Sequence, residues 1–201
     1  MKITAIKQQV KRTDRYSVFV DDAYAFSLSE SGLIESGLAS GQVLDAAAVK
    51  RLKKMAGLDK AYGQALRYTA LRVRSEWEVQ LYLQRKAVDQ EAAQEIIKRL
   101  RGLRLLNDLD FARAWVANRR LLKSTSKRRL MLELRQKHVP GEIINQVLAD
   151  DEADDRTTLR ELIEKKRSRY PDRQKLLSYL ARQGFRYDDI AAVLGEVEAE
   201  D

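Results

Sequence analysis

Cysteine is absent from this chain of 201 residues, and histidine occurs only once. The lack of cysteine excludes disulfides and thiolate chemistry, and it suits a reducing compartment, so we expect a cytoplasmic protein. With a single histidine, most metal sites and the usual nucleophile–base pairs are excluded as well. We therefore predict that the protein is not an enzyme and has no catalytic residue, no cofactor and no bound metal.

Long apolar runs and glycine-rich phosphate loops are also missing. No segment approaches the roughly 18–20 apolar residues that a membrane span requires, and the N-terminus lacks the apolar core of a signal peptide. Neither a P-loop nor a dinucleotide-binding fingerprint occurs. Apolar residues make up 44% of the chain and charged residues 34%. This composition predicts a soluble, folded protein with a heavily charged surface.

Positive charge is unevenly distributed along the chain, whose net charge is +8. Residues 61–149 contain 18 Lys and Arg against 9 Asp and Glu, a net charge of +9. An acidic cluster follows, made of Asp150, Asp151, Glu152, Asp154 and Asp155. A localised basic region favours a polyanionic partner, most simply nucleic acid. The alternative is a solvated face of mixed charges that keeps the protein in solution.

A unit of about 45–50 residues recurs three times. The segments Gln80–Ile97, Met131–Leu148 and Leu177–Leu194 align without a gap. Four apolar columns coincide: Leu83, Leu134 and Leu180; Val88, Val139 and Phe185; Ala93, Ile144 and Ile190; Ile96, Val147 and Val193. The preceding helix repeats through Ala65, Ala112 and Leu159, then Tyr68, Trp115 and Leu162. We predict that each three-helix unit cannot bury its apolar stripe alone and stacks on its neighbours, giving a long surface for binding.

The region before the repeats has a different pattern. Residues 3–10, 16–20 and 24–28 are rich in β-branched and aromatic residues, and Asp21-Asp22 suits a tight hairpin turn. These features predict a short antiparallel meander. A short helix capped by Ser29 or Ser31 should follow, and then a helix capped by Asp45 that stops at Gly57.

The predicted fold is mainly α, a tandem array of three three-helix repeats after a small α+β module. The predicted boundaries are 1–57 for the module, 58–106, 107–152 and 153–197 for the repeats, and 198–201 for an acidic tail. Predicted helix starts lie at Ser75, Asp89, Asn107 or Asp108, Ser126, Pro140, Asp154 or Asp155, and Pro171.

One turn position recurs in all three repeats. Ala87, His138 and Gly184 align between the second and third helices, where a left-handed backbone is expected. His138 is therefore interpreted as a turn residue. The acidic pairs at 150–155 and 188–189 could hold a divalent ion, but we favour helix capping for them. Trp77 aligns with polar residues, so it is either a contact between repeats or an exposed anchor, and we favour the contact.

The candidate binding surface is basic and centres on the middle repeat. Arg128 and Arg135 lie seven residues apart on one helix, on a line turned away from buried Leu130 and Leu134. Such a line could follow a phosphodiester backbone or an acidic protein groove, although a purely solvated face is the alternative. The full candidate set is Arg74, Arg85, Lys86, Arg119, Arg120, Lys123, Lys127, Arg128, Arg129, Arg135 and Lys137.

Several short sequence motifs resemble those of the RecX family of bacterial recombination regulators. They are Arg74-Ser75-Glu76, Leu105-Leu106-Asn107-Asp108, Phe111-Ala112, Glu133-Leu134-Arg135-Gln136-Lys137 and Tyr179-Leu180-Ala181-Arg182-Gln183-Gly184-Phe185. The resemblance covers roughly residues 60–195, with the motifs in the expected order. The chain departs from the family pattern at Ser124 and Ser126, where glycine is common, and at His138, which replaces the usual turn glycine.

The resemblance implies a non-enzymatic modulator of the RecA recombinase. Members of the family bind the RecA–DNA filament along its groove and typically inhibit its ATPase, strand exchange and coprotease activities in DNA repair and the SOS response. The implied partners are the RecA filament and the single-stranded DNA within it, with weak sequence-independent DNA binding, for a protein that is a monomer. A free-standing helix-turn-helix DNA-binding protein is the alternative.

Overall fold

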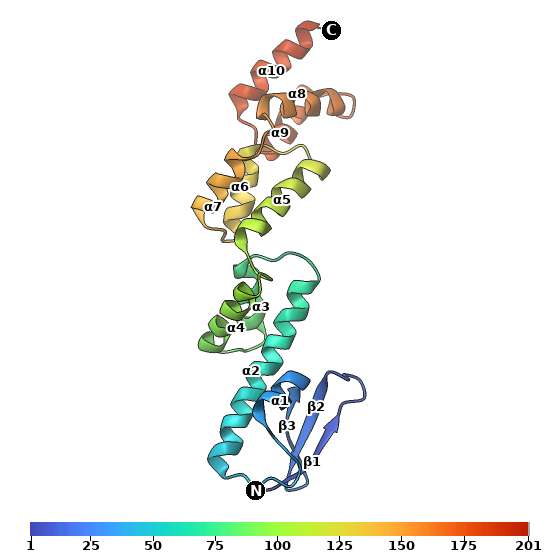
Figure 1. Ribbon diagram of the computed structural model, residues 1–201. Helices are drawn as coiled ribbons and strands as arrows, with labels where there is room; N and C mark the ends of the chain where they lie inside the picture. Colours follow the sequence, from blue (N-terminus) through green and yellow to red (C-terminus); the bar gives the residue numbers. More distant parts are fainter. Residues whose placement is uncertain (201) are drawn as a thin grey trace. The chain divides into compact units, whose positions relative to one another are not determined.

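The computed structural model describes residues 1–200 and divides the chain into two compact units. Unit 1 contains residues 1–72 and 79–105, and unit 2 contains residues 73–78 together with the chain from 106 onward. The predicted fold class is confirmed: three strands come first, and helices make up nearly all of the rest (Figure 1). In the part described, no helix is both long and apolar enough to cross a bilayer.

The N-terminal strands form the predicted meander. Strands β1 (Ile3–Gln8), β2 (Arg15–Val20) and β3 (Ala23–Ser29) pair antiparallel in the order β1-β2-β3. The β2–β3 hairpin turns at Asp21 and Asp22, whose φ angles are 48° and 65°. Positive φ at both loop residues gives a turn that follows the right-handed twist of the strands. The expectation of a tight Asp-Asp turn is confirmed.

Helix α1 (Glu30–Ser36) begins at the cap Ser29, whose side chain accepts a hydrogen bond from the Gly32 N–H, and ends at Gly37 in the left-handed conformation. Helix α2 (Ala46–Ala70) begins at Asp45, as predicted. The predicted stop at Gly57 is wrong. An exposed glycine inside a helix costs only about 1 kcal/mol relative to alanine. Buried Ala56, Ala61 and Ala65 continue the packed face of α2 past that position.

A buried ion pair joins the sheet to α2. Arg15 is 3% exposed, and its guanidinium lies 3.0 Å from the Asp59 carboxylate. Asp59 also accepts from the Ser29 N–H at 2.9 Å, and Arg15 donates to the Ser27 carbonyl oxygen at 2.9 Å. A buried charge needs this degree of hydrogen bonding to offset its desolvation. The pair therefore fixes the position of α2 on the sheet, next to a core made of Ile3, Val18, Val20, Phe26, Leu28 and Ala56.

The remaining helices follow the predicted repeat. Helix α3 (Glu76–Arg85) has its first three residues in unit 2 and the others in unit 1. Helix α4 (Gln90–Gly102) begins at the cap Asp89. The middle repeat contains α5 (Asp108–Leu122), α6 (Lys127–Gln136) and α7 (Gly141–Ala149). The third contains α8 (Asp155–Lys166), α9 (Arg173–Arg182) and α10 (Tyr187–Glu200).

Two helix ends differ from the prediction. Helix α9 is capped by Asp172 instead of Pro171, because the Asp172 carboxylate accepts from the N–H groups of Gln174 and Lys175. The predicted acidic tail does not begin at residue 198. Helix α10 continues through residue 200, and Val197, at 6% exposure, packs into the core of the third repeat. Asp201 lies outside the described residues.

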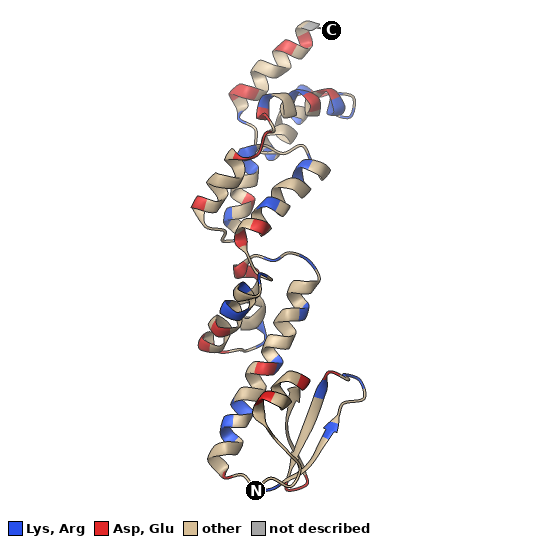
Figure 2. Ribbon diagram, viewed as in Figure 1, with Lys and Arg blue, Asp and Glu red and all other residues tan. Residues whose placement is uncertain are grey.

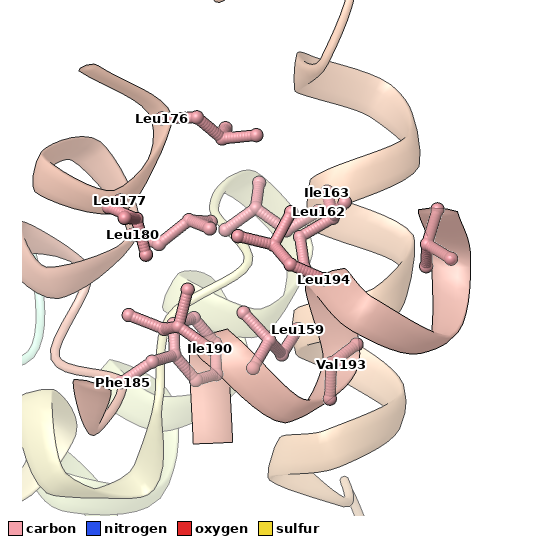
Figure 3. Close-up of a cluster of buried hydrophobic side chains, with 11 residues drawn as sticks. Leu159, Leu162, Ile163, Leu176, Leu177, Leu180, Phe185, Ile190, Val193 and Leu194 are labelled. Atoms are coloured by element: carbon pink, nitrogen blue, oxygen red, sulfur yellow. The ribbon is translucent and has the colours of Figure 1, made fainter. Parts of the chain in front are cut away.

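Each of the second and third repeats closes its own core. In the third, α8, α9 and α10 direct Leu159, Leu180 and Ile190 toward one another (Figure 3). The middle repeat does the same with Leu130, Leu134 and other apolar residues of α5, α6 and α7. The expectation that apolar stripes are buried only by stacking neighbours is therefore wrong. Three helices packed in a triangle already cover each other's apolar faces.

Candidate functional site

Within unit 2, residues of one repeat contact the start of the second helix of the preceding repeat at two places, which we call joints. The first joint lies at the start of α3, where the middle repeat contacts it, and the second joint lies at the start of α6, where the third repeat contacts it. At the second joint, Asp155 of α8 accepts a hydrogen bond from the Lys127 N–H at 2.9 Å, in the first turn of α6. The Ser126 N–H and hydroxyl both donate to the Gln183 carbonyl oxygen at 3.2 Å. Gly184, with φ of +95°, lies so close that a Cβ built on it would be 2.5 Å from Ser126 Oγ and 2.6 Å from Arg129 Cβ. Only glycine suits this position.

The first joint repeats this arrangement with different side chains. Asp108 of α5 accepts from the Glu76 N–H at 2.8 Å. Lys137 Nζ lies 2.8 Å from the Glu78 carboxylate, which is 7% exposed. The His138 ring stacks on Trp77, with 4.7 Å between the ring centroids. Trp77 is therefore the contact that was favoured from the sequence, and His138 is the turn residue, with φ of 54°.

Repeat alignment explains why the joints are alike. Asp108 and Asp155 occupy equivalent positions in the first helix of their repeats, as do Lys137 and Gln183 after the second helix. His138 and Gly184 share the left-handed turn. At each joint, the aspartate in the first helix of a repeat and the left-handed turn after its second helix lie against the N-terminus of the second helix of the preceding repeat. The exposed N–H groups of that helix start need an acceptor, and the aspartate supplies it.

Five of the predicted basic residues in the middle repeat have internal ion-pair or hydrogen-bond partners: Arg119, Arg120, Lys127, Arg129 and Lys137. Glu133 of α6 accepts from Arg119 Nε at 2.7 Å, from Trp115 Nε1 at 2.9 Å and from Arg129 Nε at 3.4 Å. The Arg119 guanidinium also lies over the Trp115 ring, 4.8 Å from its centroid. Glu133 is thus the centre of a network that ties α5 to α6, and these cations have a structural role.

The same applies to Arg120, Lys127 and Lys137. Arg120 Nη2 lies 2.6 Å from the Asp151 carboxylate, and Lys127 Nζ donates to the Asp151 carbonyl oxygen at 2.7 Å. Lys137 pairs with Glu78, as described above. These contacts were missed from the sequence because the partners lie 24 to 59 residues apart. The alignment of Asp108 with Asp155 was the available signal for the two joints, but it does not indicate these side-chain pairs.

The exposed remainder forms a narrower candidate surface, which we call the α6 face: Arg128, Leu132 and Arg135. All three are exposed, and they follow one side of α6 at spacings of four and three residues. Leu132 is 44% exposed, an apolar residue between two cations that the sequence analysis did not single out. Lys123, at the end of α5, is also exposed. Within residues 1–200, Lys123, Arg128 and Arg135 make no ion pair.

The last three candidates belong to the first repeat. Arg85 and Lys86 are exposed near the end of α3, and the Lys86 ammonium lies 5.7 Å from the centroid of the Tyr82 ring. Arg74 is partly buried just before α3. Since Arg85 and Lys86 fall in unit 1 and the α6 face in unit 2, they form separate candidates.

The four aspartates of the acidic cluster are a cap and ion-pair partners: Asp154 is the cap, and Asp150, Asp151 and Asp155 pair with arginines. Asp154 caps α8, and hydrogen bonds from the Thr157 backbone and side chain lower the pKa of its carboxyl group below the usual value. A lowered carboxyl pKa stabilises the folded state above the unfolded pKa, and this stabilisation is lost as the pH falls through the lowered value. No group of acidic or histidine side chains suited to a metal ion occurs in the described part of the chain.

We expect Glu133→Gln to destabilise the middle repeat by about 1–3 kcal/mol, because the amide keeps the shape but loses the charge that Arg119 and Arg129 share. Urea unfolding followed by circular dichroism would measure the change. Glu142→Gln, at an exposed position in the first turn of α7, is the matched control and should cost less than about 0.5 kcal/mol. Equal losses would contradict the network.

Comparison with known families gives a consistent result along most of the chain. Residues 1–45 match the regulatory protein RecX N-terminal domain. Residues 61–100, 107–148 and 154–194 match the first, second and third three-helix domains of RecX. The chain belongs to the RecX family of regulatory proteins.

Relatives and solved structures agree with this assignment. Regulatory protein RecX of Bacillus subtilis is 31% identical over 98% of this chain and 78% of its own length. RecX of Listeria monocytogenes is 32% identical over 92% of this chain and 71% of its own length. A crystal structure of regulatory protein RecX superposes with a TM-score of 0.75 at 27% identity, covering 96% of this chain and 98% of that one. RecX from Lactobacillus salivarius gives 0.61 at 26% identity, covering 71% and 97%.

Proposed function

We propose that this protein binds the RecA–DNA filament and inhibits the recombinase, lowering its ATPase, strand-exchange and coprotease activities in DNA repair and the SOS response. Membership of the RecX family carries the proposal. The α6 face supports it, since two guanidinium groups that make no ion pair within residues 1–200 lie on one side of a helix in a repeat of net positive charge. Guanidinium groups bind phosphate and carboxylate oxygens in bidentate geometry.

The filament suits the charge pattern better than bare DNA does. On bare DNA, the α6 face and Lys123 supply three cations, few for tight sequence-independent binding at physiological salt. On a filament, the same cations would meet DNA phosphates while other parts of the protein contact recombinase subunits. Contacts made after the first one form at high effective concentration, so several weak contacts combine into a strong one. The protein acts as a monomer in this proposal.

The expected result is a preference for the assembled filament. We expect affinity for the RecA–single-stranded DNA filament to exceed affinity for free RecA and for free DNA by about 10²-fold or more. ATP turnover should fall when the protein is present well below one copy per RecA subunit. Fluorescence anisotropy for the three targets in one buffer, with ATPase in parallel, measures both. Equal affinity for bare DNA and filament would favour a general DNA-binding protein instead.

Salt dependence tests the α6 face itself. The double variant R128A/R135A should bind single-stranded DNA with a log affinity versus log salt slope that is less steep by about 1.4, because two phosphate contacts are lost. R167A/R182A, which removes two exposed cations of the third repeat, is the matched control. If the control flattens the slope equally, binding comes from net charge alone and the α6 face has no special role.

The alternative function is a helix-turn-helix DNA-binding protein, in which one helix reads base edges. It predicts sequence-specific binding without recombinase. A selection from random duplexes that yields a consensus site would support that alternative.

A further inference from the structure

Unit 1 contains a groove of about 810 Å³ between α2 and the α3–α4 turn. Its floor is apolar, with Met55, Leu58, Val88 and Ala92, and all four are partly exposed. One wall, on α2, carries Arg51, Lys53, Lys54 and Lys60. The other, on α4, carries Asp89, Glu91 and Glu95. Figure 2 shows the basic residues concentrated in the first half of α2.

The position of this groove follows from the repeat. At both joints of unit 2, three positions of a repeat contact the start of the second helix of the preceding repeat. They are the aspartate in the first helix, the residue after the second helix, and the left-handed turn. The equivalent residues of the first repeat are Ala61, Lys86 and Ala87. All three line the groove, and Ala87 has the same left-handed backbone, with φ of 55°. The groove is therefore the joint face of the first repeat.

Its side chains differ from those of the other two joints in a specific way. Asp108 and Asp155 accept hydrogen bonds from a helix N-terminus, which carries partial positive charge. In the first repeat the aspartate is replaced by Ala61, and cations flank that position. Within residues 1–200, Arg51, Lys53, Lys54 and Lys60 form no ion pair. Such a face attracts carboxylates of a binding partner and not a helix N-terminus, which carries partial positive charge.

We propose that this groove binds an acidic, amphipathic segment of a partner protein. Apolar side chains of the segment cover Leu58 and Val88, and its carboxylates pair with the α2 wall. A helical segment can place its carboxylates on the side of α2, away from Glu91 and Glu95, whereas a nucleic-acid strand carries a phosphate at every nucleotide and would bring some of them close to the α4 wall. The inference extends beyond the proposed function, and its test contains no recombinase and no filament.

The probe is a fluorescein-labelled helical peptide of about 14 residues, with Leu at helical spacing, Glu on one flank of the Leu stripe and Gln on the other. A second peptide with Lys in place of Glu is the charge control. Anisotropy is measured with the full-length protein and with K54E/K60E. The control variant K98E/K165E reverses two exposed charges that do not line the groove. Leu58→Gln tests the floor, and circular dichroism checks that each variant is folded.

We expect the Glu peptide to bind and the Lys peptide to bind far more weakly. K54E/K60E should weaken binding at least tenfold, Leu58→Gln several-fold, and K98E/K165E less than about twofold. Failure of the Glu peptide to bind below about 1 mM would overturn the proposal. Displacement of the peptide by oligo-dT, with the same loss in K54E/K60E, would show a nucleic-acid site instead. A dimer in sedimentation that K54E/K60E abolishes would show that a second copy occupies the groove.

Discussion

Replacing Leu134 by alanine should lower the free energy of unfolding by about 2–5 kcal/mol. Leu134 is fully buried at the centre of the middle repeat, where α5, α6 and α7 meet. Truncation removes apolar contacts and leaves a cavity that a small three-helix core cannot fill by collapse. Because this core is closed within one repeat, the loss should appear mainly in the unfolding transition of that repeat.

The neighbouring residue provides the control. Arg135 is exposed on α6 and lies away from the buried stripe, so Arg135→Ala should cost less than about 0.5 kcal/mol. Urea unfolding of both variants, followed by circular dichroism and tryptophan fluorescence, distinguishes them, since Trp115 packs on the same core. Similar losses for the two variants would mean that the assignment of buried and exposed positions on α6 is wrong.

Replacing Gly184 by alanine should also be strongly destabilising, by about 2–4 kcal/mol. The backbone at residue 184 is left-handed, which strains any residue with a Cβ. The added Cβ would also lie 3.1 Å from the Arg129 backbone nitrogen, in addition to its close approach to the Ser126 and Arg129 side chains. Overpacking of this kind costs about 1–3 kcal/mol on its own.

A second glycine serves as the control, because replacing it by alanine changes helix propensity without adding backbone strain or a close contact. Gly195 lies inside α10, and a Cβ there would meet nothing within 4 Å. Gly195→Ala should therefore stabilise the third repeat by about 0.5–1 kcal/mol. Differential scanning calorimetry of both variants gives the comparison. A harmless Gly184→Ala would show that the second joint is looser than its distances imply.

Local features were predictable from the sequence because their chemistry is contained in a few residues. Asp45 and Asp89 were expected as caps and Ser126 as a helix start, and each accepts a backbone hydrogen bond in the first turn of its helix. The left-handed turns at Ala87 and His138 followed from alignment with Gly184. A cap or a turn depends on neighbours within four residues, so the sequence specifies it locally.

The features that were missed depend on distant neighbours. Gly57 was expected to end a helix, but packing on both sides of it overrides a weak local preference. The internal partners of Arg119 and Arg120 could not be read from charge counts, which do not separate a paired cation from an exposed one. The candidate surface was therefore predicted too broadly. Only the interatomic distances in the structure distinguish the cations that pair with internal carboxylates from those that are exposed.

The self-contained cores of the second and third repeats have an energetic consequence. In a nearest-neighbour description of a repeat protein, stability is a sum of intrinsic terms and interface terms. Here the intrinsic terms contain nearly all of the apolar burial, and the interface term of the second joint rests on a few hydrogen bonds around Ser126, Asp155 and Gly184. Cooperativity between these modules should be weak, so the third can unfold and refold while the middle repeat stays intact.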